Sequence, residues 1–202
     1  MVTLVDYGLG NIQAFANIYR RLNIAVSIAR TAEDLVAARR IILPGVGSFD
    51  WAMDRLEASG MRLCLDDLVL RKKRPVMGVC VGMQMIALRS DEGSRAGLGW
   101  LGADVKRLPA QATQKPIQLP HMGWNDVEAT DNSLFSGIVS PRFYFLHSYY
   151  FAPVDLNHVL ASVNYHGTFA AAVGGGNIFG VQFHPEKSHH WGVQLLKNFA
   201  EI

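Results

Sequence analysis

Residues 75–89 read PVMGVCVGMQMIALR and combine an apolar run with a helical pattern. The apolar run at 75–79 predicts a buried strand, and the spacing of apolar residues at 82–89 predicts a helix directly after it. The chain upstream repeats this alternation of short apolar runs and helical patterns. Further strands are predicted at 2–5, 24–29 and 40–43, and further helices at 12–22, after Thr31 and from 49 to about 70. Such alternation predicts a parallel sheet covered by helices on both faces.

The second half of the chain has a different pattern. Strand-like runs at 143–150, 159–165, 168–173 and 178–183 follow one another closely, the sequence GGGN at 174–177 is typical of a hairpin turn, and a closing helix is predicted at 191–199. The predicted fold is therefore α/β, with a single domain spanning residues 1–202. Its central sheet is mostly parallel and flanked by helices, with an antiparallel portion in the second half.

Composition excludes several classes of protein. The 202 residues carry a net charge of +2, without the clustered basic excess of a nucleic-acid-binding domain. The longest apolar stretch, 76–88, is shorter than the ~20 residues that a membrane helix needs, and the N-terminus lacks the pattern of a signal peptide. Two cysteines, Cys64 and Cys80, cannot form a disulfide framework and favour a reducing, cytoplasmic location. A chain of this size has room for one active site.

Cys80 lies between Gly78 and Gly82, where the predicted strand ends and the helix begins. This is the G-x-nucleophile-x-G spacing of a nucleophile elbow, with cysteine in place of serine. Glycine permits the sharp turn, and the start of the helix then brings backbone N–H groups, that of Val81 among them, beside the sulfur. The alternative is a buried cysteine packed among valine and methionine, which is the role that the helical surroundings of Cys64 predict.

The sequence QFHPEKS at 182–188 follows the last predicted strand. Pro185 favours an extended backbone at His184, and residues two apart in an extended chain point to the same side, so Glu186 can hold the imidazole. A base oriented by a carboxylate is what a cysteine nucleophile requires. The alternative is a surface histidine at a strand end. His-x-Glu also occurs in zinc deaminases, but the Pro-Cys-x-x-Cys part of that signature is missing, so no metal site is predicted.

Three other segments are rich in glycine or polar residues. The loop LPGVGS at 43–48 leaves the third predicted strand at the same sheet edge as Cys80, where α/β sheets bind ligands. Its glycine amides can complete an oxyanion hole, or they can form an ordinary turn. Taken in isolation, HMGWN at 121–125 is typical of a tryptophan-anchored loop and HSY at 147–149 of a strand end.

In this chain order, the glycine loop, the cysteine elbow and His-Pro-Glu resemble the class I glutamine amidotransferase family. Within that family the chain is most similar to the glutaminase subunits of imidazole glycerol phosphate synthases, from histidine biosynthesis. The matching segments cover nearly the whole chain and lie at 6–8, 10–11, 44–47, 78–84, 120–125, 143–149 and 177–188. HMGWN and HPEKS are the more specific of these, and Val81 stands where the family usually has leucine.

The resemblance implies a role for each matching residue. Cys80 would attack the side-chain amide of the substrate glutamine, His184 would move the proton, and Glu186 would orient His184. Residues implied to hold the oxyanion are Val46, Gly47 and Val81; those implied to bind glutamine are Gly47, Gln84, Ser148 and Tyr149; and those implied to face a partner are Asn11, Trp124, Tyr144 and Lys187.

The resemblance also implies a partner, and it implies no cofactor. A cyclase subunit with a (β/α)8 barrel would form a heterodimer with this chain, receive its ammonia and complete imidazole glycerol phosphate. The isolated chain would be nearly inactive, because the loop at 44–47 would need the partner and its acceptor ligand to rearrange. Three alternatives stay open: a glutaminase for another acceptor, as in pyridoxal phosphate synthase or a paralogous synthase, a stand-alone cysteine hydrolase, and a non-catalytic regulatory module.

Overall fold

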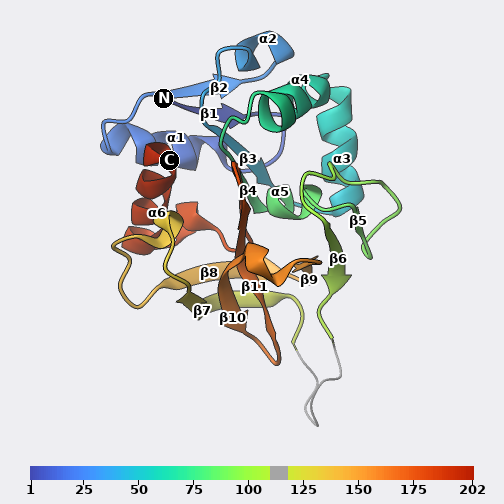
Figure 1. Cartoon of the computed structure of the whole chain (residues 1–202), viewed down its shortest axis with the longest axis vertical. Helices are drawn as coiled ribbons and strands as arrows, with labels where there is room; N and C mark the ends of the chain where they lie inside the picture. Colours follow the sequence, from blue (N-terminus) through green and yellow to red (C-terminus); the bar gives the residue numbers. More distant parts are fainter. Residues whose placement is uncertain (110–117) are drawn as a thin grey trace.

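A computed structural model describes residues 1–109 and 118–202 of the chain. Within these residues the chain forms a nine-stranded mixed sheet with the order β2-β1-β3-β4-β12-β11-β10-β7-β8 (Figure 1). The parallel strands are β1 (Val2–Val5), β2 (Val26–Ala29), β3 (Ile41–Gly45), β4 (Val76–Cys80) and β12 (Ile178–Val181). All but β2 are buried along their whole length, which confirms the prediction of a parallel sheet covered on both faces.

The remainder of the sheet is antiparallel, as predicted for the second half of the chain. Its strands are β7 (His121–Ala129), β8 (Arg142–His147), β10 (Val159–Asn164) and β11 (Thr168–Gly175). A tight turn joins β11 to β12, since Gly175 pairs with Ile178, and this confirms the hairpin predicted from GGGN. A separate three-stranded sheet of β5 (Arg89–Ser90), β6 (Ala103–Arg107) and β9 (Tyr149–Pro153) contacts β11 through β9.

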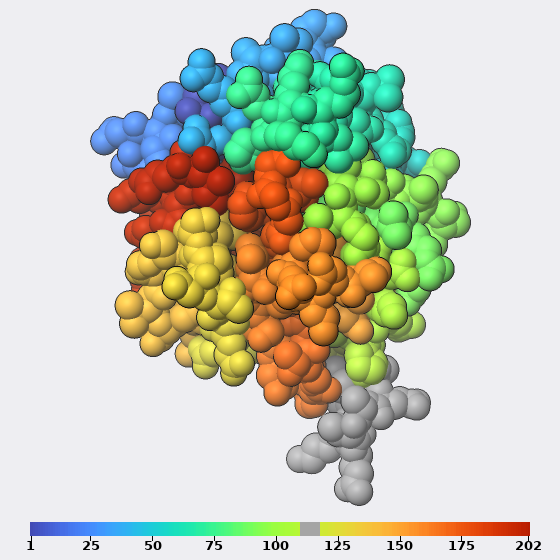
Figure 2. All heavy atoms as spheres, in the orientation of Figure 1, coloured from blue at the N-terminus to red at the C-terminus, as the bar shows by residue number. Residues whose placement is uncertain are grey.

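Helices cover the parallel strands. They are α1 (Ile12–Arg21), α2 (Ala32–Leu35), α3 (Phe49–Ala58), α4 (Arg62–Asp66) continuing as η1 (Asp67–Arg71), α5 (Val81–Met85) and α6 (His189–Glu201), with short turns η2 (Ser133–Phe135), η3 (Leu156–His158) and η4 (Pro185–Lys187). Figure 1 shows α1 beside α6 on one side of these strands, and α3 beside α5 on the other. In the space-filling view the segment that carries η2 lies against α6 (Figure 2). In the described part of the chain, no helix is long and apolar enough to cross a membrane.

Two predictions about the second half were wrong. The run at 143–150 is not one strand, because the chain breaks at Ser148 and passes from β8 in the large sheet to β9 in the small one. The segment 121–125 is not a loop but the start of β7. The more buried positions of β7 alternate along the strand and are His121, Gly123, Asn125 and Val127. Three of these four are polar or glycine, so the sequence of β7 lacks the apolar run that predicted strands such as β10 and β11.

The helix predicted at 82–89 is shorter than expected. Helix α5 begins at Val81 and ends at Met85. Two backbone groups that would continue the helix bond elsewhere instead: Met85 O accepts from Leu98 N at 2.7 Å, and Leu88 N donates to Ala103 O at 2.9 Å. Contacts with the later loop and with β6 therefore end the helix, which no local pattern in 82–89 reveals.

Candidate active site

Cys80 ends β4 and stands at the N-terminus of α5, so the predicted elbow is confirmed as a strand–turn–helix junction. Its backbone φ is +55°, a region that L residues rarely adopt, and its side chain is 4% exposed. The flanking glycines are required by packing. A Cβ on Gly82 would overlap the carbonyl oxygen of Leu43, and one on Gly78 would overlap the backbone of Gly82. The elbow therefore holds a strained backbone at its apex, a feature that concentrates at functional sites.

His184 and Glu186 follow β12 at the same edge of the sheet. The His184 Nδ1 lies 2.9 Å from the Glu186 Oε1, and both side chains are 4% exposed. The backbone N–H of His184 donates to Tyr144 O at 2.9 Å, and the Ser188 hydroxyl donates to His184 O at 2.6 Å. The Glu186 contact orients the ring and the two other contacts fix the main chain that carries it, so the expectation that Glu186 lies on the side of His184 and holds its imidazole is confirmed.

The electrostatics of His184 favour its charged form. Burial by itself lowers the pKa of His184, but hydrogen bonds and charge interactions with Cys80 and Glu186 outweigh burial and raise the pKa to about 10. A proton in this part of the site therefore rests on the imidazole at neutral pH.

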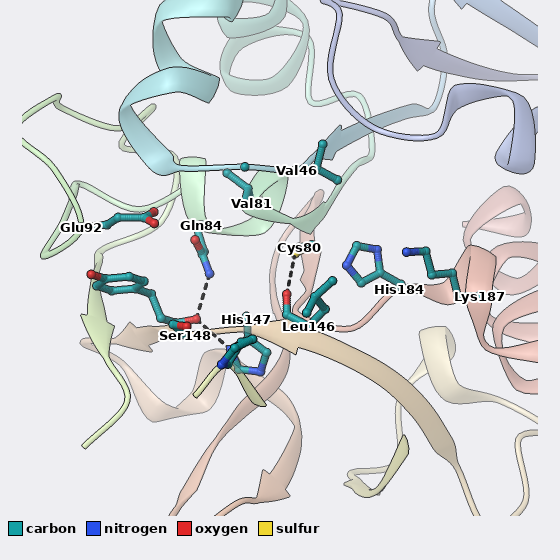
Figure 3. A pocket seen from close by; sticks show the side chains of 13 residues that line it. Val46, Cys80, Val81, Gln84, Glu92, Leu146, His147, Ser148, His184 and Lys187 are labelled. Carbon is teal, nitrogen blue, oxygen red and sulfur yellow. Dashed lines mark hydrogen bonds between the residues drawn. The ribbon is translucent and has the colours of Figure 1, made fainter. Parts of the chain in front are cut away.

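A cavity of about 320 Å³ opens beside Cys80 (Figure 3). Besides Cys80 and His184, the predicted site residues that line it are Val46, Gly47, Val81, Gln84, Ser148, Tyr149 and Lys187. The structure thus gathers into one pocket residues that the sequence spreads over some 140 positions, from Val46 to Lys187.

The glycine loop enters the pocket from β3. Gly45 pairs with Cys80 across the β3–β4 ladder, and a Cβ on Gly45 would overlap the backbone at Gly82. Gly47 has a φ of +89°, and the Tyr7 hydroxyl donates to Pro44 O at 2.7 Å. The loop is therefore held close against the elbow, with its two following residues lining the cavity.

Gln84 lies one helical turn after Cys80 and is 2% exposed. Its Nε2 donates to Tyr149 O at 2.9 Å and to Gln182 Oε1 at 3.2 Å. The carbonyl of Ser148 accepts from Leu108 N at 2.9 Å. The carbonyl groups of residues 148 and 149 are thus engaged within the protein, so the pocket presents the amide oxygen of Gln84 and the side chain of Ser148 in their place.

Glu92 also lines the pocket, and no sequence pattern indicates it. Figure 3 shows its carboxylate on the wall facing the Gln84 amide. Glu92 follows β5 in the connection to β6, among polar residues that are typical of any surface loop. Only the tertiary fold brings it to the cavity. His147, at the end of β8, is a second lining residue whose place in the pocket the sequence did not indicate.

Three of the four residues expected to face a partner lie together, and one of them, Lys187, also lines the pocket. The Trp124 and Tyr144 rings are 6.1 Å apart, and the Lys187 Nζ lies 5.8 Å from the Tyr144 ring centre. Asn11 is the N-cap of α1, because its side chain accepts from Ala14 N at 3.1 Å. Across residues 1–109 and 118–202, no group of three or more histidine, cysteine, aspartate or glutamate side chains is arranged to hold a metal ion.

A buried cysteine on a strained strand-to-helix turn, with a histidine that lines the same cavity and is held by a glutamate, is the arrangement of α/β enzymes that use a cysteine nucleophile. Comparison with known proteins gives the particular family. Residues 3–202 match the sequence model of "Glutamine amidotransferase class-I", and the chain belongs to that family of enzymes.

Individual relatives agree with this assignment. Over its full length the chain is 55% identical to the imidazole glycerol phosphate synthase subunit HisH of Bdellovibrio bacteriovorus and 50% identical to that of Leptospira interrogans, covering 100% of each. A solved structure described as a glutamine amidotransferase superposes with a TM-score of 0.77 at 20% identity, covering 100% of this chain and 99% of that one. The last comparison shows the fold, and the predicted fold class is confirmed.

Proposed function

We propose that this chain is the glutaminase subunit of an imidazole glycerol phosphate synthase, a single domain spanning residues 1–202 that acts in the cytoplasm without a cofactor of its own. The observation that carries the proposal is the strained Cys80 sharing one pocket with His184, whose imidazole is held by Glu186. Identity of about half to full-length relatives named HisH supports the choice of synthase.

The chemistry requires one nucleophile and one mobile proton. Cys80 Sγ attacks the side-chain amide carbon of glutamine, and the proton held by His184 passes to the departing ammonia, leaving a γ-glutamyl thioester. Water, deprotonated by His184, then hydrolyses the thioester to glutamate, and the proton returns to the site. The backbone N–H groups of Val46, Gly47 and Val81 are our candidates to hold the oxyanion, because all three residues line the cavity beside Cys80.

Recognition of glutamine needs groups for its amino-acid end. Glu92 carries a carboxylate on one wall of the pocket and Gln84 faces it with an amide oxygen, so together they form an acceptor pair suited to an α-ammonium group (Figure 3). Ser148 and the backbone of Gly47 are left as polar groups for the α-carboxylate. The cavity of about 320 Å³ is large enough for one amino acid of this size.

The cyclase partner is proposed to dock beside the pocket mouth. Met122, Trp124 and Leu146 are between 37% and 61% exposed, and β7–β8 pairing puts Met122 opposite Leu146 and Trp124 opposite Tyr144 on one face of the sheet. Leu146 also lines the cavity, so this apolar face is continuous with the pocket. A (β/α)8 cyclase covering it as the other half of a heterodimer would receive ammonia directly.

Lys187 borders both the pocket and this face, whereas Asn11 is the weakest of the proposed contacts, since it already caps α1.

Replacement of Cys80 tests the proposal. Cys80→Ala should abolish glutamine-dependent synthesis by the complex and leave ammonia-dependent synthesis by the cyclase intact. Cys64→Ala is the matched control, since Cys64 is the other free thiol and does not line the cavity. Glutamine hydrolysis at the normal rate in Cys80→Ala would contradict the proposed chemistry.

The partner is tested by measuring glutamine turnover with and without a candidate cyclase. We expect the isolated chain to be nearly inactive, because the glycine loop at 44–47 needs the partner to adopt its active arrangement. Vigorous glutaminase activity alone would contradict that dependence. Stimulation only by a pyridoxal phosphate synthase or another synthase would move the chain to a different acceptor, and turnover of peptides or esters alone would make it a cysteine hydrolase.

A further inference from the structure

Two buried histidines form a pair at the pocket, where His147 lines the wall, and the proposed chemistry does not use them. His121 on β7 and His147 on β8 are paired across the strands and are 3% and 6% exposed. The His121 Nδ1 lies 3.0 Å from the His147 Nε2. The His121 ring is stacked between Phe145 and Tyr165, at 4.7 and 4.0 Å between ring centres, so it has little freedom to turn.

The partners of the two rings fix the positions of their protons. The His147 Nδ1 lies 2.9 Å from Tyr149 O, and a carbonyl oxygen only accepts, so this nitrogen carries the hydrogen. The His147 Nε2 is then an acceptor and the His121 Nδ1 donates to it. At the far end, the Asn125 Nδ2 lies 3.4 Å from the His121 Nε2. Burial lowers the pKa of His147 to about 3 and that of His121 to about 4, which agrees with two neutral rings.

The series of hydrogen bonds that begins at His121 and His147 ends at Gln84, which lines the pocket. Tyr149 O accepts from His147 and also from the Gln84 Nε2 at 2.9 Å, so both of its lone pairs are occupied. Tyr149 is the first residue of β9, directly after the break at Ser148 where the chain changes sheets. The His147 side chain bridges that break. It thereby fixes the corner that presents Ser148 to the cavity and holds the Gln84 amide.

The orientation of Gln84 follows from this corner. Because its nitrogen is committed to Tyr149 O and Gln182 Oε1, its oxygen is left as the atom available to a ligand. Among the residues that the structure describes, no donor is recorded within hydrogen-bond distance of that oxygen. Figure 3 shows the Gln84 amide and the Glu92 carboxylate on facing sides of the same space.

We propose that His147, supported by His121, is a positioning residue. Its hydrogen bond to Tyr149 O holds the β8–β9 corner in place, and the corner in turn fixes the orientation of the Gln84 amide so that its oxygen accepts from the α-ammonium group of the substrate. This inference rests on the proposed glutaminase function. If it is right, the histidine pair causes the pocket to bind glutamine more tightly than a γ-amide that lacks the α-amino group. His147 itself does not touch the reacting atoms.

Protection of Cys80 from alkylation by iodoacetamide tests the proposal on the full chain without a partner. The protecting ligands are glutamine and glutaramate, which is the same γ-amide without the α-amino group. In the wild type, glutamine should protect at concentrations at least about tenfold lower than glutaramate. In His147→Phe, with protection expressed relative to the unprotected alkylation rate of the same variant, we expect glutamine to be required at about tenfold higher concentration and the glutaramate curve to be unchanged.

A second variant and a control complete the experiment. His121→Phe keeps the ring stacked on Phe145 and Tyr165 and removes its hydrogen bond to His147, so it should shift the glutamine curve in the same direction. The double variant should shift it no further than His147→Phe, because both residues act through one corner. Tyr165→Phe keeps the stacking on His121 and should behave as the wild type.

The possible failures are distinguishable. If glutamine fails to protect the wild type, the proposed function is overturned and this inference with it. If glutamine protects the wild type but both histidine variants keep the wild-type preference over glutaramate, the inference alone is overturned. If both variants weaken glutamine and glutaramate equally, the histidines are merely structural, which also overturns it.

Discussion

The Glu92 carboxylate accepts a hydrogen bond from the backbone N–H of Phe49, with 2.8 Å between Oε2 and the nitrogen. Phe49 is the first residue of α3, which begins directly after the glycine loop, and Ser48 before it makes no side-chain cap. Asp50, the next residue of α3, accepts from Ser94 N at 2.9 Å and from Arg95 N at 3.0 Å, both in the loop that carries Glu92. A residue on the pocket wall therefore also caps the helix that follows the proposed oxyanion loop.

Substitution of Glu92 should separate these two roles. Glu92→Gln keeps an acceptor for Phe49 N but loses the charge, so we expect the KM for glutamine to rise about tenfold or more with stability unchanged. Glu92→Ala should also lose about 1 kcal/mol of unfolding free energy, because α3 loses its cap. The measurements are glutamine kinetics in the complex and urea unfolding. Glu128→Gln, an exposed carboxylate on β7, is the control, and an unchanged KM in Glu92→Gln would exclude contact with the substrate.

A second prediction concerns the glycine behind the elbow. Gly82→Ala should destabilise the chain by about 2–3 kcal/mol, because the new Cβ would overlap the Leu43 carbonyl and neither backbone has room to move. Glutamine turnover should fall with it, since Cys80 is displaced. Gly102→Ala is the matched control, because nothing lies within 4 Å of its Cβ and it should unfold as the wild type does. Equal stability of the two variants would show that the elbow tolerates a side chain.

The sequence reveals the parts of this site that depend on local spacing. Gly78, Cys80 and Gly82 set the elbow within five residues, and His184 reaches Glu186 across one proline, so both units follow from rules about neighbouring residues. The same holds for the capping box that begins α2, where the side chain of Asp34 accepts from the Thr31 N–H.

Other parts depend on contacts between distant segments, which no local rule contains. Glu92 reaches the pocket only because Asp50 holds its loop against α3, 43 or more residues away along the chain. The early end of α5 is caused by the loop at 97–99, and the strand break at Ser148 by the existence of a second sheet. Sequence patterns therefore indicate the proposed reacting groups, whereas the residues proposed to position them follow only from the tertiary structure.

The raised pKa of His184 leads to a third prediction. Cys80→Ala removes the hydrogen bond and charge interaction that help to hold the His184 proton, so its pKa should fall below the value of about 10. Glu186→Gln should lower it too, because an amide no longer stabilises the imidazolium by charge. NMR titration of the His184 ring measures both effects, with Cys64→Ala as the control. A titration midpoint unaffected by either substitution would mean that neither group is coupled to the imidazole.

The buried histidine pair should make the fold sensitive to mild acid. The pKa values of His121 and His147 are lowered by burial to about 4 and about 3, below the ordinary 6.5, so the unfolded chain takes up these protons first. Unfolding free energy must then fall as pH drops from 6.5 toward 4, by about 2 kcal/mol for each histidine between pH 7 and pH 5. Urea unfolding at pH 7, 6 and 5 measures this loss. In the variant carrying both His121→Phe and His147→Phe the loss should be smaller by about 4 kcal/mol, whereas His190→Gln on the exposed start of α6 should retain it. An equally steep loss in the double variant would assign the acid sensitivity to other groups.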